Sequence, residues 1–203
     1  MNGILNLTDN PSISKGALDM GSNTITYGDL AINTGVGDVT GKNSRNSMVA
    51  SKLYTFGNPY SNAIFAPSIG TIPSNITMDV ALGTAPGWKT TAAKRIYTMT
   101  QTGNVSTKAT IQMHYLDNEI NGNTEELLVP WYYVYSTVFQ GVSRSNYDVN
   151  NNYLTLSNVN FNFPTGTQFS LANSTTTSSI WTCLLYTSPS PRDRTRSRMP
   201  SSA

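Results

Sequence analysis

The amino-acid sequence predicts an all-β protein, with short β-solenoid-like strands at its N-terminus followed by an antiparallel β-sandwich. Only 12% of its 203 residues are charged, whereas Asn, Ser, Thr and Gly are abundant, which argues against a coiled coil or a helical bundle. Apolar and polar residues alternate in many short segments, as strands with one buried face require. The sequence contains no convincing amphipathic helix.

Three short units open the chain: Gly3–Leu7 (GILNL), Gly16–Met20 (GALDM) and Gly28–Ile32 (GDLAI). Each unit has the pattern Gly-x-Leu-x-apolar, and their first residues are separated by 13 and 12 positions. Turn-forming residues fill the gaps, so residues 1–34 are predicted to form the end of a stacked β-solenoid, with an edge meander of a sandwich as the alternative. Residues 35–52 are rich in Gly, Asn and Ser and lack a sustained period, which predicts a junction.

Residues 53–172 are predicted to form the sandwich, with about eight short strands at the spacing typical of that fold. Within the segment 127–135, Pro130 cannot donate to a ladder and therefore indicates an edge or a bulge. Residues 173–182 are polar and predict a linker. The segments with strand patterns are Ala63–Ala66, Ile76–Leu82, Arg95–Thr100, Val105–Tyr115, Leu127–Tyr135, Tyr153–Asn158 and Gln168–Ala172.

Residues 183–203 differ in composition from the rest of the chain and are predicted to be a disordered, non-native tail. The string CLLYTSPSPRD (Cys183–Asp193) resembles one translation frame of a transposon-end sequencing adapter, and SRMPSSA (Ser197–Ala203) resembles a frame of the flow-cell adapter that follows it. The tail holds four of the thirteen basic residues, one of the eleven acidic residues and the only Cys. Residues 1–182 therefore carry a net charge of −1.

This charge balance gives no support to nucleic-acid binding, since a nucleic-acid interface needs clustered Lys and Arg. No run of eighteen apolar residues occurs, so membrane insertion is not expected. Without Cys, residues 1–182 can form no disulfide and perform no thiol chemistry. Such a chain fits an exported bacterial protein that is stabilised by its sheets.

Several segments resemble a known family. They are NSMVASKLYTFGN (Asn46–Asn58), NAIFAPSIGTIPSNITMDV (Asn62–Val80), TIQMHYLDNEINGNTEELLVPWY (Thr110–Tyr132) and the closing segment Phe161–Ala172. Together they resemble, over residues 40–172, a β-sandwich domain of large adhesin-like proteins of Bacteroidota that are secreted or displayed by the type IX system. The resemblance implies a surface or matrix role, flanking domains in the same parent chain and no catalytic residues.

The loop LDNEINGNTEE presents oxygen-bearing side chains at every second position, with Gly122 between them. This spacing partly matches a calcium-binding loop, although Leu128 stands where a bidentate carboxylate belongs. The alternative is an ordinary turn built on Asn-Gly chemistry. The candidate metal ligands are Asp117, Glu119, Asn121, Asn123 and Glu125. No other cofactor is expected.

No catalytic residue is predicted. His114 is the only His, it is expected to face outward, and no G-x-S-x-G nucleophile motif accompanies it. One His without a native Cys cannot form a usual zinc site. A pair of carboxylates for glycoside hydrolysis would have to come from the single acidic loop at 117–126, where a solvated turn is the simpler interpretation.

Aromatic residues are the remaining candidates for a binding site. The strand at 127–135 alternates its aromatic side chains between two faces, one of which should enter the core. The other face is expected to present Tyr132, together with Trp88, to a glycan. The sequence therefore predicts a non-catalytic structural or adhesive module of a secreted or cell-surface bacterial protein, with glycans or surface proteins as partners. The alternative is a carbohydrate-binding accessory module of a polysaccharide-degrading enzyme.

Overall fold

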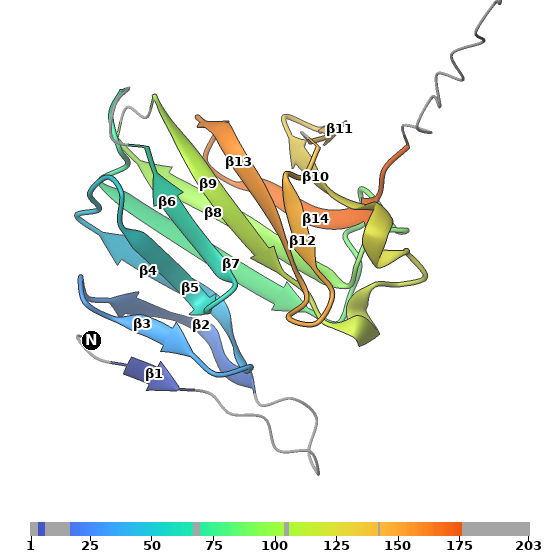
Figure 1. Cartoon of the computed structure of the whole chain (residues 1–203), viewed down its shortest axis with the longest axis horizontal. Coiled ribbons are helices and arrows are strands. Elements are labelled where there is room, and N and C mark those ends of the chain that lie inside the picture. Colours follow the sequence, from blue (N-terminus) through green and yellow to red (C-terminus); the bar gives the residue numbers. More distant parts are fainter. Residues whose placement is uncertain (1–3, 7–16, 67–69, 104–105, 142, 176–203) are drawn as a thin grey trace, which may run out of the picture.

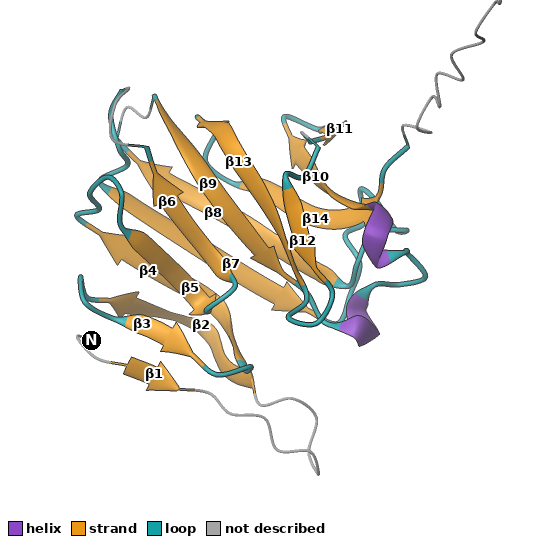
Figure 2. Cartoon of the chain, viewed as in Figure 1, coloured by secondary structure: helices purple, strands orange, loops and turns teal. Residues whose placement is uncertain are grey.

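The computed structural model describes residues 4–6, 17–66, 70–103, 106–141 and 143–175. Two sheets pack face to face, which confirms the all-β class and the sandwich (Figures 1 and 2). The larger sheet contains β2 (Ala17–Tyr27), β4 (Asp38–Asn46), β7 (Asn75–Leu82), β8 (Arg95–Thr102), β10 (Leu128–Val134), β11 (Thr137–Gln140) and β14 (Thr167–Asn173). Its seven strands lie in the order β11-β10-β14-β8-β7-β4-β2.

The smaller sheet contains β5 (Leu53–Asn58), β6 (Ser61–Phe65), β9 (Thr107–His114), β12 (Asn146–Asp148) and β13 (Tyr153–Phe161), in the order β12-β13-β9-β6-β5. Two 3₁₀ turns, η1 (Asp117–Glu119) and η2 (Glu125–Leu127), connect β9 to β10. Within the described residues, no helix is long and apolar enough to span a membrane. The predicted tail at 183–203 and most of the linker at 173–182 lie outside the described residues.

The N-terminal strands pair in parallel, unlike the other ladders. β1 (Ile4–Asn6) pairs with β3 (Ile32–Thr34), and β2 pairs with β4. All other ladders in the described residues are antiparallel, including β4 with β7. Stacked solenoid coils would pair in parallel, but here β2 and β4 also continue directly into the seven-stranded sheet. The solenoid end at 1–34 therefore stays a prediction.

The segment 35–52, predicted as a junction, contains β4 in the interior of the larger sheet. Its buried positions include polar side chains, so the strand lacks the apolar alternation that would have revealed it. Arg45 is one of these side chains, with only 1% of its surface exposed. It donates hydrogen bonds to the carbonyl oxygens of Thr55 (3.0 Å), Gly28 (2.9 Å) and Ala31 (2.7 Å). Arg45 thereby joins the turn after β2 to β5.

Two further contacts fasten the N-terminal strands to the sandwich. The Tyr27 hydroxyl donates to Oδ1 of the fully buried Asn43 at 2.7 Å. The Gly57 N–H donates to Asn33 Oδ1 at 3.1 Å, which connects β3 to β5. Gly57 has a φ of +83°, and a Cβ at this position would lie 2.7 Å from the carbonyl oxygen of Val39. Only glycine fits this approach between strands.

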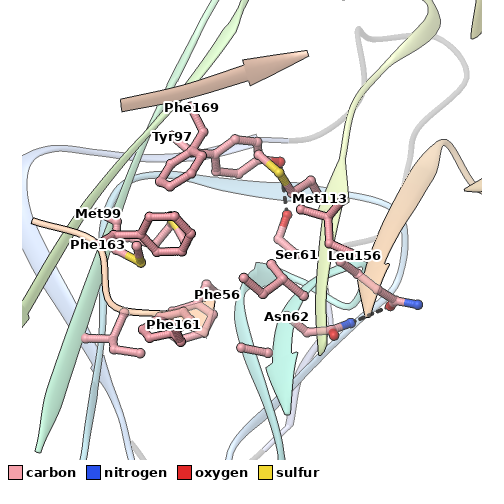
Figure 3. Close-up of a pocket in the computed structure, with 15 residues that line it drawn as sticks. Phe56, Ser61, Asn62, Tyr97, Met99, Met113, Leu156, Phe161, Phe163 and Phe169 are labelled. Atoms are coloured by element: carbon pink, nitrogen blue, oxygen red, sulfur yellow. Dashed lines mark hydrogen bonds between the residues drawn. The ribbon is translucent and has the colours of Figure 1, made fainter. Parts of the chain in front are cut away.

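The main core lies between the two sheets and is rich in aromatic rings and methionines. Figure 3 shows the rings of Tyr97, Phe161, Phe163 and Phe169 around a small cavity. The Phe163 and Phe169 rings meet edge to face with centroids 5.0 Å apart. The cavity has a volume of about 40 Å³, which is far below the few hundred Å³ of a small-molecule site. We therefore treat it as a packing void of the core.

Candidate functional site

A cluster of buried, coupled ionisable side chains lies inside the sandwich around Arg95. This residue is 1% exposed, and its guanidinium binds both oxygens of Asp38 (3.1 and 2.8 Å) and both oxygens of Glu119 (2.7 and 3.2 Å). His114 Nδ1 lies 3.2 Å from Asp38 Oδ1. The Tyr97 hydroxyl, which donates to the His114 carbonyl oxygen at 2.5 Å, completes the cluster. The cluster joins β4, β8, β9 and η1.

Burial and charge set the protonation of this cluster. Burial opposes ionisation of Asp38, but the Arg95 charge and the hydrogen bonds from His114 and Arg95 outweigh it and hold the pKa of Asp38 well below its ordinary range. Burial lowers the pKa of His114, and its hydrogen bond to Asp38 offsets only part of that effect. A neutral His114 therefore donates Nδ1–H to an ionised Asp38.

The structure corrects the expectation that His114 faces outward, since His114 is only 4% exposed. The strand alternation placed His114 opposite Met113, whose side chain enters the core. At this end of β9 both side chains are buried, because Asp38 of β4 lies over His114. The alternation pattern of one strand cannot show that a residue of another strand, here Asp38, covers one of its outward positions.

The predicted calcium-loop residues are placed in and around η1 and η2, but most of their polar groups already have partners. Glu119 is committed to Arg95 and also accepts from the Leu116 N–H at 3.1 Å. The Asn152 amide donates to Asp117 Oδ1. One carboxylate oxygen of Glu125 is buried without a hydrogen-bond partner among the described residues, and burial together with the charges of Asp117 and Glu126 raises the pKa of Glu125.

The two asparagines of this loop act as donors to the backbone. Asn121 Nδ2 donates to the carbonyl oxygens of Thr90 (3.0 Å) and Ala92 (2.8 Å). Asn123 Nδ2 donates to the Thr91 carbonyl oxygen at 2.8 Å, and Asn123 Oδ1 accepts from the Asn173 N–H at 2.8 Å. The loop thus connects the β7–β8 segment to β14 through hydrogen bonds. This is a structural role, as expected of an ordinary turn. In the described ranges, no cluster of three or more Asp, Glu, His or Cys side chains could hold a metal ion.

The structure separates the two predicted glycan contacts, Trp88 and Tyr132. The Tyr132 partner across the β10–β14 ladder is Phe169, whose side chain is in the core. Tyr132 therefore faces the interior side of the sheet, which corrects the expectation that it shares an outward face with Trp88. The residue beside Trp88 is Tyr133, because side chains alternate along β10.

Trp88 and Tyr133 form an aromatic pair on the outer face of the seven-stranded sheet. Their rings are stacked, with centroids 5.7 Å apart and planes 7° apart, and both side chains are partly exposed. Trp88 Nε1 donates to Gln168 Oε1 at 2.7 Å, which fixes the orientation of the indole. Beside them, the Lys89 ammonium lies 3.6 Å from the centroid of the Trp131 ring. The β7–β8 connection thus holds an aromatic platform on the sheet.

A row of polar side chains continues from this platform across the outer face. Each row member is the cross-strand partner of the next, so all point to the same side of the sheet, opposite the core residues of the same strands. The row is Tyr133, Gln168, Thr98, Asp79, Lys42 and Thr24, on β10, β14, β8, β7, β4 and β2. Sequence reasoning missed the row, although the alternation within 76–82 and 95–100 already separated the core residues from these polar ones.

A hollow of about 360 Å³ lies at the β2 side of this row. Its lining residues are Asp19, Gly21, Thr40, Gly41, Asp79, Val80, Ala81 and Leu82. The Asp19 carboxylate accepts from the Gly21 N–H (2.9 Å) and the Thr40 hydroxyl (3.0 Å), and these hydrogen bonds lower the pKa of Asp19. The outer face therefore carries an aromatic platform at one end and a polar hollow at the other.

A second accessible hollow, of about 340 Å³, lies between β10–β11 and β13. Tyr132 forms one wall, and its ring stacks on Phe139 with centroids 5.2 Å apart. Both polar ends of Gln140 at the rim are engaged by Ser174 and Thr175. We call this hollow the Tyr132 groove. It is lined by Pro130, Tyr132, Gln140, Gly141, Leu156, Val159, Asn160, Phe163 and Phe169.

Comparison with known proteins adds no relative: no family model, no curated protein and no solved structure matches the chain.

Proposed function

We propose that this protein is a non-catalytic structural or adhesive module of a secreted or cell-surface bacterial protein, with glycans or surface proteins as its partners. The observation that carries the proposal is the contrast between the interior and the surface. The strongly coupled ionisable groups are buried around Arg95. The surface instead carries the Trp88–Tyr133 platform, the Tyr132 groove with its aromatic and amide side chains, and a polar hollow that contains the carboxylates of Asp19 and Asp79.

The burial of the Arg95 cluster argues against hydrolysis or elimination. A general acid or base must reach the proton that it transfers, directly or through one water. His114, Asp38 and Glu119 are each at most 5% exposed and already bind one another or Arg95. Within the described part of the chain, the best-matched acid–base groups therefore support the fold.

The surface supports a binding role. The outer face of the larger sheet exposes Thr, Gln, Asp and Lys side chains beside the Trp88–Tyr133 platform, and aromatic rings at an accessible site are a frequent sign of recognition. The absence of Cys from residues 1–182 and the network of hydrogen bonds between strands fit a protein exported and folded without disulfides.

A second candidate function, a carbohydrate-binding accessory module of a polysaccharide-degrading enzyme, is favoured by the same platform. The two roles differ in what the isolated protein binds. An accessory module should bind a purified polysaccharide, whereas an adhesive module should also bind intact bacterial or host surfaces.

The test uses the purified full chain, labelled with a fluorophore, against whole cells, extracellular matrix proteins and a panel of insoluble and soluble polysaccharides. Each polysaccharide is also incubated with the protein and examined for new reducing ends and for unsaturated products. Saturable binding without product formation supports the proposal. Depolymerisation that disappears in the His114→Asn variant would refute it.

A further inference from the structure

We propose that the outer face of the seven-stranded sheet binds an extended, uncharged oligosaccharide, which runs across the strands from the Trp88–Tyr133 platform to the hollow beside Asp79. The proposal rests on the binding role proposed above and specifies its ligand and site. It assigns contact roles to Tyr133, Gln168, Thr98 and Asp79, none of which sequence reasoning selected.

The geometry suits a chain-like ligand. Tyr133 and Asp79 are three strands apart in the cross-strand row. With strands spaced by about 4.8 Å, these two positions are roughly 14 Å apart, and Gln168 and Thr98 lie between them. The contacts thus follow a line rather than a ring around a single pocket, and the hollow of about 360 Å³ extends the line toward β2.

The chemistry of the row suits a sugar. A pyranose has an apolar C–H face, which can pack on the partly exposed indole of Trp88, and a rim of hydroxyls, which need donors and acceptors. Gln168 Oε1 is occupied by the Trp88 indole, so the Gln168 amide nitrogen is left to donate. The Thr98 hydroxyl and the Asp79 carboxylate form no side-chain hydrogen bond to another described residue, and both are partly exposed. They can both accept from sugar hydroxyls.

The charge of the row favours an uncharged ligand. Asp79 and Lys42 are direct cross-strand partners, so the row carries one negative and one positive charge side by side. The hollow next to them adds the carboxylate of Asp19, whose lowered pKa keeps it ionised. A polyanionic chain such as a uronate polymer would therefore be repelled at the hollow, whereas neutral hydroxyls would find acceptors there.

The Tyr132 groove is less suited to the same ligand. Its lining is mostly apolar, and both polar ends of Gln140 are already bound to Ser174 and Thr175. Asn160 is the one rim side chain whose amide forms no hydrogen bond to another described residue. A sugar placed in this groove would leave several hydroxyls without partners, at a cost in affinity.

The experiment measures binding of the full chain to neutral oligosaccharides of one to six units, built from glucose, xylose, mannose or galactose, and to a uronate oligomer as the charged control. Isothermal titration calorimetry gives the affinity for each length. We expect at least one neutral series to bind, with affinity that rises with length until the row is spanned, and no binding of the uronate oligomer.

Variants locate the site. Trp88→Ala should weaken binding about tenfold or more, because it removes the stacking surface. Thr98→Val removes one hydroxyl in the middle of the row at nearly constant volume and should weaken binding severalfold. Thr137→Val, an exposed threonine on β11, is the matched control and should leave the affinity unchanged. Melting temperatures of all variants confirm that each one is folded.

The outcomes separate this inference from the proposed function. Neutral-sugar binding that survives Trp88→Ala but is lost in Tyr132→Ala would overturn the assigned face. Uronate binding tighter than neutral-sugar binding would overturn the assigned ligand class. If cells or proteins are bound and no oligosaccharide is, the oligosaccharide site is wrong and the adhesive function stands. If an oligosaccharide is cleaved, the proposed function itself fails.

Discussion

Arg95 donates hydrogen bonds to both carboxylate oxygens of Asp38, at 3.1 and 2.8 Å, although the two residues are 57 positions apart in the chain. This two-point contact fixes the orientation of both planar groups. Since Arg95 also binds Glu119, one guanidinium neutralises part of the charge of two buried carboxylates. The position of η1 beside the sheets therefore depends on Arg95.

Replacing Arg95 should be severely destabilising. In the Arg95→Met variant, Asp38 and Glu119 would remain buried without their cation, and breaking a buried pair in this way costs about 3–5 kcal/mol of unfolding free energy. Lys94→Met is the control, because the neighbouring Lys94 side chain is exposed and should change stability by no more than about 0.5 kcal/mol. Urea denaturation measures both. Equal costs for the two variants would show that the cluster contributes no stability.

Stability should fall as the solution becomes acidic, in two stages. The pKa values of His114 and Asp38 are both lower in the folded protein than the ordinary 6.5 and 3.8, so the unfolded chain binds more protons. The contribution of these two groups to the unfolding free energy is thus present above about pH 6.5. It declines below that pH as unfolded His114 is protonated, and again below about pH 4 as unfolded Asp38 is protonated.

The His114→Asn variant tests the first stage alone. An asparagine at this position keeps an N–H donor for Asp38 but does not titrate. Denaturation measured at several pH values from 4.5 to 7.5 gives the unfolding free energy at each pH. This free energy should fall with decreasing pH in the wild-type protein and should change less in the variant. The same pH dependence of the unfolding free energy in both proteins would mean that protonation of His114 does not cause the first stage.

The N-terminal strands should unfold together with the sandwich. Tyr27→Phe removes the donor to buried Asn43 Oδ1 and should lower the unfolding free energy of the whole protein by about 1–3 kcal/mol. Tyr135→Phe, at a position that is 83% exposed, should have almost no effect. Thermal melts monitored by circular dichroism provide the comparison. A separate early transition, with the main one unchanged in Tyr27→Phe, would indicate that these strands form an independent unit.

Gly57 should not tolerate a side chain. A methyl group at this positive-φ position would meet the Val39 carbonyl oxygen, so Gly57→Ala should cost more than about 1 kcal/mol. Gly87 offers a matched control, because nothing lies within 4 Å of the Cβ that alanine would add there and its φ is not in the left-handed range. Melting temperatures of the two variants should differ by several degrees. Similar temperatures would mean that β4 and β5 can move apart to accommodate the methyl group.

The loop at 117–125 should behave as a turn rather than as a calcium site. Melting temperatures measured with excess calcium and with a chelator should agree, because a ligand of the native state would raise the value. Asn123→Ala should lower the melting temperature, since Asn123 bridges the Thr91 carbonyl and the Asn173 N–H. A clear rise with calcium would instead restore Asp117 and Glu125 as ligands.

The strands with apolar alternation could be predicted from the sequence. The segments at 76–82, 95–100, 153–158 and 168–172 all lie in strands of the sandwich. β4 could not be predicted in this way, because Asn43, Ser44 and Arg45 are buried for their hydrogen bonds rather than for hydrophobicity. In a single sequence, a strand whose buried residues are polar and form hydrogen bonds to other strands has the composition of a loop.

The candidate sites show the same limit. Alternation along β10 correctly divides Tyr132 from Tyr133, but it cannot say which side meets the second sheet. That choice depends on Phe169 and on strands far away in the sequence. Likewise, the spacing of oxygen atoms at 117–125 resembles a ligand set, whereas the fold turns Asn121 and Asn123 toward backbone carbonyls. In both cases, contacts with residues far away in the sequence determine where the side chains point.

The path of the chain through the larger sheet determines how the sandwich would respond to mechanical tension. β2 runs parallel to β4, and the next three steps, to β7, β8 and β14, each reverse direction. Ala17 at the start of β2 and Asn173 at the end of β14 therefore lie at the same end of the sheet. A pull between them acts across the ladders, so hydrogen bonds are loaded one after another instead of all at once. β2, which pairs only with β4 among the described strands, would separate first, and the sheet would yield strand by strand.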